Sequence, residues 1–264
     1  MLRWLKVDLH IHTVLSSCAE LSMGPKDIVH KAVSEGLDMI AITDHNAADN
    51  VAAVIGAARN WPLTVIAGME VSTKEEAHVL CLFEDVDRVM RFQEFIQAGL
   101  PEGVNDESFF GPQIICDENE HVLGKCEKLL AFSTRHPFDS VAAKARELGG
   151  IVIPAHIDRK SCSLLKAFGF VPQNAAIDAL EIQEVKNLET LQMEHIKNSG
   201  YPIVTDSDAH DVDRIGSRYT YIYAAEASFV ELKAALKGDG GRRISVREPA
   251  QEVLEATLYE RNDE

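Results

Sequence analysis

The chain has 264 residues, 46% of them hydrophobic and 26% charged, which is ordinary for a globular protein with a substantial core. Its 26 basic and 42 acidic side chains give a formal charge of −16, so binding to a long polyanion such as nucleic acid is not expected. A small anion stays compatible with this charge, because bound metal cations reverse the local sign.

No apolar run reaches the roughly 18 residues that a membrane helix needs. Charge and histidine interrupt the N-terminal segment at once, so it does not read as a secretory signal. We therefore expect a soluble, cytoplasmic protein that does not interact with membranes. The five cysteines are odd in number and form no CxxC pair, which argues against a disulfide framework and against a structural zinc knuckle.

Short apolar runs alternate with helical patterns along most of the chain. Strands are predicted at 5–9, 38–42, 63–67, 78–83, 151–154, 179–182, 202–205 and 219–223. Helices are predicted at 25–35, 47–59, 85–98, 140–148 and 228–237. Repeated strand–helix units indicate an α/β fold with a parallel sheet, and one α/β barrel can take up the whole length.

Residues 99–131 interrupt this alternation, because they combine Gly, Pro and Asn with a polar DENEH cluster. We interpret them as an irregular insertion within one domain that spans residues 5–245. The remaining segment, 246–264, is predicted to be a charged C-terminal tail.

Histidines and acids follow the predicted strands, at the edge where the carboxyl ends of parallel strands meet. The motifs are DLHIH, AITDH, AGME, VIPAH and TDSDAH, and a further histidine opens the strand that begins HVL. His10 and His12 are two apart on an extended segment, so both rings point to the same side. Imidazole and carboxylate together suit Zn, Mn or Fe, and the number of groups exceeds the needs of one ion. We expect two or three divalent ions.

In this order the motifs DLHIHT, ITDH, GMEVS, PAH and SDAH resemble those of the PHP (polymerase and histidinol phosphatase) superfamily. The resemblance implies a distorted (β/α)7 barrel, similar to a TIM barrel, that holds up to three metal ions. It also implies the metal ligands, which by position are His10, His12, His45, Glu70, His78, His156, Asp208 and His210. In this interpretation Glu70 bridges two ions, and Asp44 orients a neighbouring ligand.

The chain departs from the family at one position. The family often has an aspartate five residues after the second histidine, where this chain has Ser17. A hydroxyl is a poor ligand for such ions, so we expect Glu20 to act as the ligand, with the softer thiolate of Cys18 as the alternative.

These residues predict a phosphoesterase that cleaves a phosphate mono- or diester of a small metabolite or nucleotide by a metal-bound hydroxide. Arg159 and, less strongly, Lys160 are candidate contacts for the phosphate, and an exposed salt bridge is the alternative for Arg159. Two other functions stay open. An amidohydrolase-like enzyme would cleave C–N bonds but usually has a bridging lysine, and a degenerate barrel would bind metal or ligand for regulation.

Overall fold

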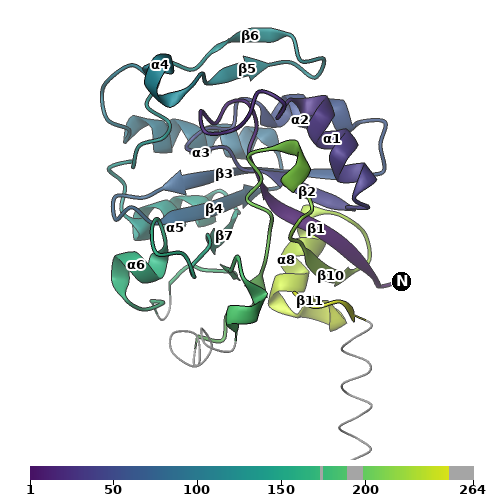
Figure 1. The fold of residues 1–264 in the computed structure, drawn as a ribbon. Coiled ribbons are helices and arrows are strands. Elements are labelled where there is room, and N and C mark those ends of the chain that lie inside the picture. The colour runs from purple at the N-terminus through teal and green to yellow at the C-terminus, as the bar shows by residue number, and fades with distance from the viewer. Residues whose placement is uncertain (173–174, 189–198, 250–264) are drawn as a thin grey trace, which may run out of the picture.

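Seven strands form one curled, mixed sheet in the computed structural model, which describes residues 1–172, 175–188 and 199–249 (Figure 1). Across the sheet the order is β11 (Arg243–Ser245), β10 (Thr220–Ala224), β1 (Arg3–Ile11), β2 (Met39–Ile42), β3 (Thr64–Ser72), β4 (His78–Phe83) and β7 (Ile151–Pro154). A separate parallel pair consists of β8 (Leu180–Glu181) and β9 (Ile203–Val204). The expected α/β class with a curled, barrel-like sheet is confirmed.

The strands are not all parallel, contrary to our expectation. β1, β2 and β3 run parallel to one another, but β4 is antiparallel to both β3 and β7. The reason is the short connection between β3 and β4, which has no room for a crossover helix. As a result the start of β4 lies beside the end of β3, where His78 is opposite Ser72.

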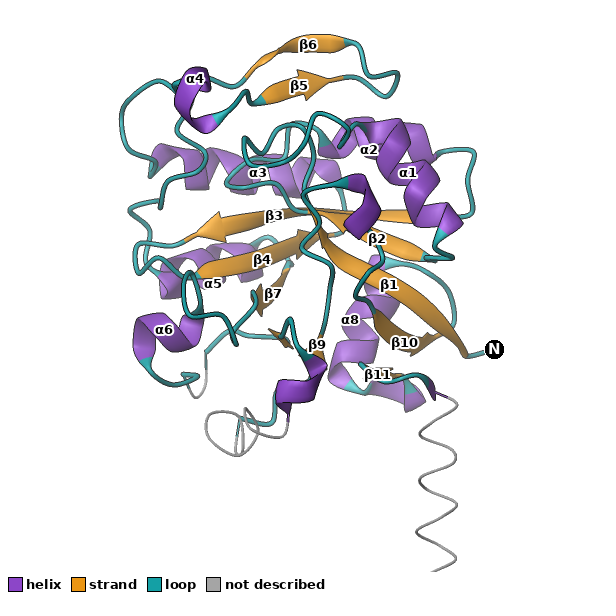
Figure 2. Cartoon of the chain, viewed as in Figure 1, coloured by secondary structure: helices purple, strands orange, loops and turns teal. Residues whose placement is uncertain are grey.

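Helices cover the sheet on two sides (Figure 2). The larger apolar cluster contains residues from α1 (Pro25–Ser34), α2 (Val51–Ala58), α3 (Val86–Ala98) and α5 (Phe138–Glu147). The smaller cluster contains residues from α8 (Phe229–Lys237). The short helix α6 (Leu164–Phe168) follows β7 in the chain. The predicted helix at 47–59 begins only at Val51, because Asn46 has a positive φ of 50° and Asn50 uses its side chain to bind Thr13 and Ile114.

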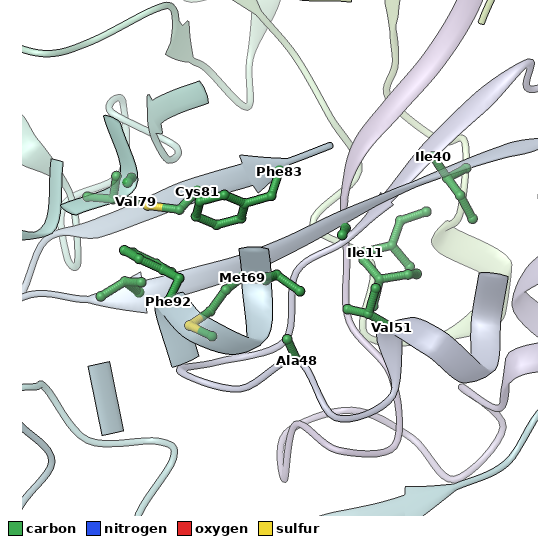
Figure 3. Packing of buried hydrophobic residues seen from close by; sticks show 14 of the residues in the cluster. Ile11, Ile40, Ala48, Val51, Met69, Val79, Cys81, Phe83 and Phe92 are labelled. Carbon is green, nitrogen blue, oxygen red and sulfur yellow. The ribbon is translucent and has the colours of Figure 1, made fainter. Parts of the chain in front are cut away.

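Strand β4 shows how the sheet is buried on both faces. Val79, Cys81 and Phe83 point into the larger cluster, where Figure 3 shows them near the side chains of α3. Leu80 and Leu82 point into the smaller cluster on the other face. This double burial explains why the strand is a continuous apolar run, a pattern that by itself does not reveal strand direction.

The insertion at 99–131 is more regular than predicted. It contains a short helix, α4 (Glu107–Phe110), and a hairpin of β5 (Ile114–Cys116) and β6 (Val122–Lys125). The hairpin is tied to the loop after β1 by a hydrogen bond from Ile114 N–H to the Val14 carbonyl, 2.9 Å. The alternation of strand residues is too short here to be recognised from the sequence.

The sheet ends at Ser245 with β11, a strand that the sequence analysis did not predict. The proposed tail at 246–264 lies outside the described residues from residue 250 onward. Among the helices that the structure describes, none has the length and apolarity needed to cross a membrane.

Candidate metal centre

The predicted ligands converge on one edge of the sheet. Two isolated bridges draw the strand ends together there, one between Ile11 and Ala209 and one between His45 and Glu70. The donor atoms form three groups in which all atoms lie within 4.8 Å of one another. These groups are His10, His12, Glu70 and Asp208; His45, Glu70 and His78; and His12, His45 and His210.

The carboxylate of Glu70 is the centre of this arrangement, and it is buried in β3. Its Oε1 lies 2.9 Å from His78 Nδ1 and 3.1 Å from His156 Nε2. Its Oε2 lies 3.0 Å from His45 Nδ1, yet the approach does not meet hydrogen-bond geometry, and within the described chain this oxygen has no partner. A buried carboxylate oxygen that faces only ring nitrogens is unsatisfied unless a cation joins them.

His10 and His12 approach the same carboxylate from β1. Each ring places its Nε2 3.4 Å from an oxygen of Glu70 and 3.4 Å from Asp208 Oδ1. The two Nε2 atoms are 3.2 Å apart, as the i, i+2 spacing predicts. The His210 ring stacks on His12 with centroids 4.0 Å apart, which places it at the same edge.

Asp44 lies one step behind these rings. It accepts hydrogen bonds from Thr13 N–H, 2.7 Å, and from Ser16 Oγ, 2.6 Å. Because the single hydroxyl hydrogen of Ser16 is used on Asp44, the 3.0 Å contact between Ser16 Oγ and His12 must be donated by His12 Nδ1. The Nε2 lone pair of His12 is then free to face Glu70, so Asp44 acts on His12 through Ser16.

Cys18 interacts with histidines of the cluster, and neither Cys18 nor Glu20 belongs to the three donor groups. Cys18 is itself exposed, and partial desolvation of its thiol raises its pKa, but interactions with His210 and His45 outweigh this effect and lower the pKa of Cys18 to about 6. The backbone of Glu20 faces His210, since its N–H donates to the His210 carbonyl at 2.8 Å. The side chain of Glu20 is exposed and accepts a hydrogen bond from the Ser22 hydroxyl at 3.5 Å.

A cavity of about 430 Å³ opens in front of the cluster. Arg159 lines this cavity, and its Nη1 donates a hydrogen bond to Asp208 Oδ2 at 3.1 Å. Gln183 Nε2 donates to the same oxygen, also at 3.1 Å. Arg214 lines the cavity too and makes no ion pair with the rest of the described chain. Lys160 is exposed and is not among the lining residues.

Sequence reasoning missed two residues here. Glu181 contacts His10 Nδ1 at 2.9 Å, and Arg214 adds a cation to the cavity wall. Glu181 lies inside the strand predicted at 179–182, whereas the candidate ligands come mainly from residues that follow predicted strands. Arg214 follows His210 by four residues, and no motif points to it.

Burial and charge act in opposite directions on the rings. Burial lowers the pKa of His10, but the surrounding carboxylates, first Glu181 and then Glu70, outweigh it and raise this pKa well above its usual value. Burial and the neighbouring rings lower the pKa of His12 well below its usual value. Against burial, Glu70 raises the pKa of His78 to about 9. His10 and His78 thus favour a positive charge at places that bound cations would fill, whereas His12 favours its neutral form.

The donor set fits divalent transition metals. Imidazole nitrogen with carboxylate oxygen is the combination that Zn, Mn and Fe accept. Two of the residues, His156 and Asp208, have positive φ values of 31° and 52°, in a region that side chains rarely adopt. Such backbone strain concentrates at functional sites, where the surrounding structure maintains it.

Comparisons with known proteins identify the family and support the fold. The family model of the PHP domain matches residues 8–183. The uncharacterized protein YqxK of Bacillus subtilis is 35% identical over 107 residues, which cover 38% of this chain and 27% of YqxK. The lesion-specific endonuclease PfuEndoQ from Pyrococcus furiosus has a TM-score of 0.65 at 20% identity, covering 92% of this chain and 58% of that chain.

A two-domain protein from Bacteroides vulgatus, described as containing a predicted PHP-like metal-dependent phosphoesterase, has a TM-score of 0.53 at 15% identity. That likeness covers 89% of this chain and 63% of the other. The chain thus spans about a quarter of YqxK and less than two thirds of either solved chain. Because the matching family model covers more than half of its residues, this chain belongs to the PHP domain family.

Proposed function

We propose that this chain hydrolyses a phosphate ester of a small metabolite or nucleotide, with two or three divalent ions held around Glu70. The observation that carries the proposal is one buried carboxylate with five imidazole rings within 3.4 Å of its oxygens. A cluster so rich in donors for Zn, Mn or Fe is the arrangement that metal-dependent phosphoesterases need.

The three donor groups suggest how the ions are shared. Glu70 belongs to two of them and would bridge two ions, while His156 Nε2 is near enough to its Oε1 to join the second group. His12, His45 and His210 form the third group, and we propose that the Cys18 thiolate completes it. A thiolate ligand would favour zinc at this position.

Side chains at the cavity wall would hold the phosphate. When bound, the ions would lower the pKa of a water molecule and polarise the phosphoryl oxygens. Arg214 offers the ester a guanidinium that makes no ion pair among the described residues, and Arg159 has further donors beyond the one that Asp208 engages. Asp208 in turn is oriented by Arg159 and Gln183, so these two residues act on both ligand and substrate.

The charge of −16 supports a small substrate. Endonuclease Q has also been solved with a 27-mer duplex that carries an abasic lesion at the active site, so DNA is the first competing substrate to test. Glu70 would take the bridging position that a lysine usually has in amidohydrolases, which disfavours the amidohydrolase-like alternative. A degenerate regulatory barrel is disfavoured by the number of donors that converge.

Phosphate release tests the proposal directly. The metal-free chain would be reloaded with Zn, Mn or Fe and offered phosphorylated metabolites, mononucleotides and a duplex with an abasic site. We expect metal-dependent release from a small ester, and none from the Glu70→Gln variant. Cleavage of the duplex alone would replace the small substrate by DNA, and turnover of amides alone would overturn phosphoester hydrolysis.

A further inference from the structure

We infer that Glu181 is a positioning residue of the metal centre, whose carboxylate fixes His10 with one oxygen and the backbone of His156 with the other. The inference rests on the proposed function, because it assigns to Glu181 the task of presenting two proposed ligands. Glu181 ends β8, is fully buried, and belongs to none of the donor groups.

The first contact determines how the His10 ring is used. Glu181 Oε1 lies 2.9 Å from His10 Nδ1, and a carboxylate oxygen can only accept, so Nδ1 carries the hydrogen. In the neutral ring the lone pair is then on Nε2. That atom lies 3.4 Å from both Glu70 Oε1 and Asp208 Oδ1, on the side of the metal donors. Glu181 therefore selects the tautomer and the ring orientation that suit a metal ligand.

The second contact fixes the turn that follows β7. Glu181 Oε2 accepts a hydrogen bond of 2.6 Å from the His156 backbone N–H. His156 has a φ of 31°, which is unfavourable for a residue with a β-carbon, so the turn needs such support. The Glu181 carbonyl also accepts from Ile157 N–H at 2.9 Å. Held this way, the His156 ring reaches Glu70 Oε1 at 3.1 Å.

These contacts make an isosteric variant informative. Both oxygens of Glu181 accept hydrogen bonds from N–H groups, whereas glutamine has one acceptor and one donor. In Glu181→Gln, the amide NH₂ must face either the His156 N–H or the His10 Nδ1–H, with almost no change in volume. The substitution thus disturbs one ligand while leaving the packing in place.

Asp178 offers a matched control. It is also a largely buried acid, its Oδ2 accepts from the Val152 N–H in β7 at 2.8 Å, and it pairs with Arg146. Asp178 binds β7 itself, whereas Glu181 binds the turn that follows β7, and Asp178 belongs to none of the donor groups. Asp178→Asn therefore makes the same carboxylate-to-amide change and reports the cost of a weakened fold.

The experiment compares the full-length parent chain, Glu181→Gln and Asp178→Asn. Zn and Mn affinities would be measured by competition with a chelator, and melting temperatures would be measured without metal. We expect Glu181→Gln to lose about 10- to 100-fold in metal affinity, the scale for partners of metal-bound histidines, and Asp178→Asn to keep the parent affinity. Ring-nitrogen NMR of the zinc-loaded chains, in which a metal-bound His10 is neutral, should show the Nδ1–H tautomer of His10 in the parent and a mixture of tautomers in Glu181→Gln.

Parent-like metal affinity in a folded Glu181→Gln chain would overturn the inference, and so would an equal loss in Asp178→Asn. If Glu181→Gln does not fold, Glu181→Asp replaces it. The side chain of aspartate is one methylene shorter, so its carboxylate cannot reach both contacts. We again expect a loss of metal affinity, and a metal affinity equal to that of the parent would contradict the inference. Metal binding by the parent without phosphate release from any ester would remove the proposed function but leave this inference standing.

Discussion

The metal centre has a buried half and an open half, and the chain builds them differently. His10, His12 and Glu70 form the buried half, with side chains at most 1% exposed. Each of its two rings is backed by a carboxylate, directly by Glu181 or through Ser16 by Asp44. In the open half, the side chains of His78 and His210 are 16% and 28% exposed.

This difference indicates which donor atoms are held in place before a metal ion binds. In the buried half, packing and charged hydrogen bonds already hold the donor nitrogens in place. In the open half, His210 lies on a loop, and its Nδ1 contacts the backbone carbonyl of Asp208 at 3.0 Å instead of a buried carboxylate, so we expect its final orientation to depend on the ion. Substitutions should therefore cost most in the buried half and least at the cavity wall.

The largest effect is expected from His10→Ala. This variant removes a ligand of the buried group, so metal content should fall and the catalytic rate should drop at least ~10²–10³-fold, the scale of losing one electrostatic stabiliser. Elemental analysis and phosphate release would measure both, with His30→Ala as control, since His30 packs against Trp61 away from the site. If a folded, metal-free His10→Ala chain keeps the parent rate, the activity belongs to another site or to a contaminant.

The next effect is expected from Asp44→Asn, which acts on His12 through Ser16. Metal affinity should fall about 10- to 100-fold, because the His12 ring loses its fixed tautomer. Chelator competition would measure it. Asp38→Asn is the matched control, because Asp38 binds the backbone of Lys6 at the far end of β1. Unchanged metal affinity in Asp44→Asn would show that the hydrogen bonds from His12 through Ser16 to Asp44 do not affect metal binding.

In the open half, Cys18→Ser and Glu20→Gln separate the two candidates for the third group. We expect Cys18→Ser to lose one ion of the two or three while keeping part of the activity, since the Glu70 groups stay intact. Glu20→Gln should keep the parent stoichiometry. Ion counting on gently purified protein decides between them. Loss of the ion in Glu20→Gln alone would restore the original hypothesis that Glu20 is the ligand.

At the cavity wall, Arg214→Ala should raise KM about 10-fold, the scale of one hydrogen bond to a charged group, with metal content unchanged. Arg159→Ala should also lower kcat, because it removes a partner of Asp208. Steady-state kinetics on the substrate found by the screen would compare them. Identical kinetic profiles for the two variants would mean that the contact with Asp208 has no catalytic consequence.

The smallest expected effect is on stability without metal. Glu70 raises the pKa of folded His78 to about 9 from its usual 6.5, so His78 stabilises the fold fully below pH 6.5 and loses this effect as pH rises through 9. The melting temperature of the metal-free parent should exceed that of His78→Gln by a few degrees near pH 6, and the gap should close by pH 9.

The difference in melting temperature between parent and His78→Gln reports on His78 alone. Cys18 has the opposite effect on the pH dependence of stability, because its pKa in the folded chain is lowered to about 6. Differential scanning fluorimetry across this pH range would follow the gap. A gap that widens with pH would contradict the assigned direction. With metal bound the slope should reverse, because ions and protons compete for the same nitrogens.

By itself, the sequence determined most of the elements outside the insertion and most of the candidate ligands. Apolar periodicity is local, so the strands at 78–83 and 151–154 were predicted with the bounds that the structure has. The i, i+2 spacing of His10 and His12 determines that both rings face one side. Acids and histidines at the ends of β1, β2 and β3 were expected to converge because those strands are parallel, and they do.

Only the tertiary structure decided how distant residues meet. Strand direction does not appear in periodicity, so the antiparallel β4 that brings His78 to the ligand edge was not foreseen. Glu181 is 171 residues from His10, and no local pattern links them. The choice between Cys18 and Glu20 depends on which side chain the loop turns toward His210. Contacts of this kind arise from packing between segments far apart in the chain, which local propensity does not encode.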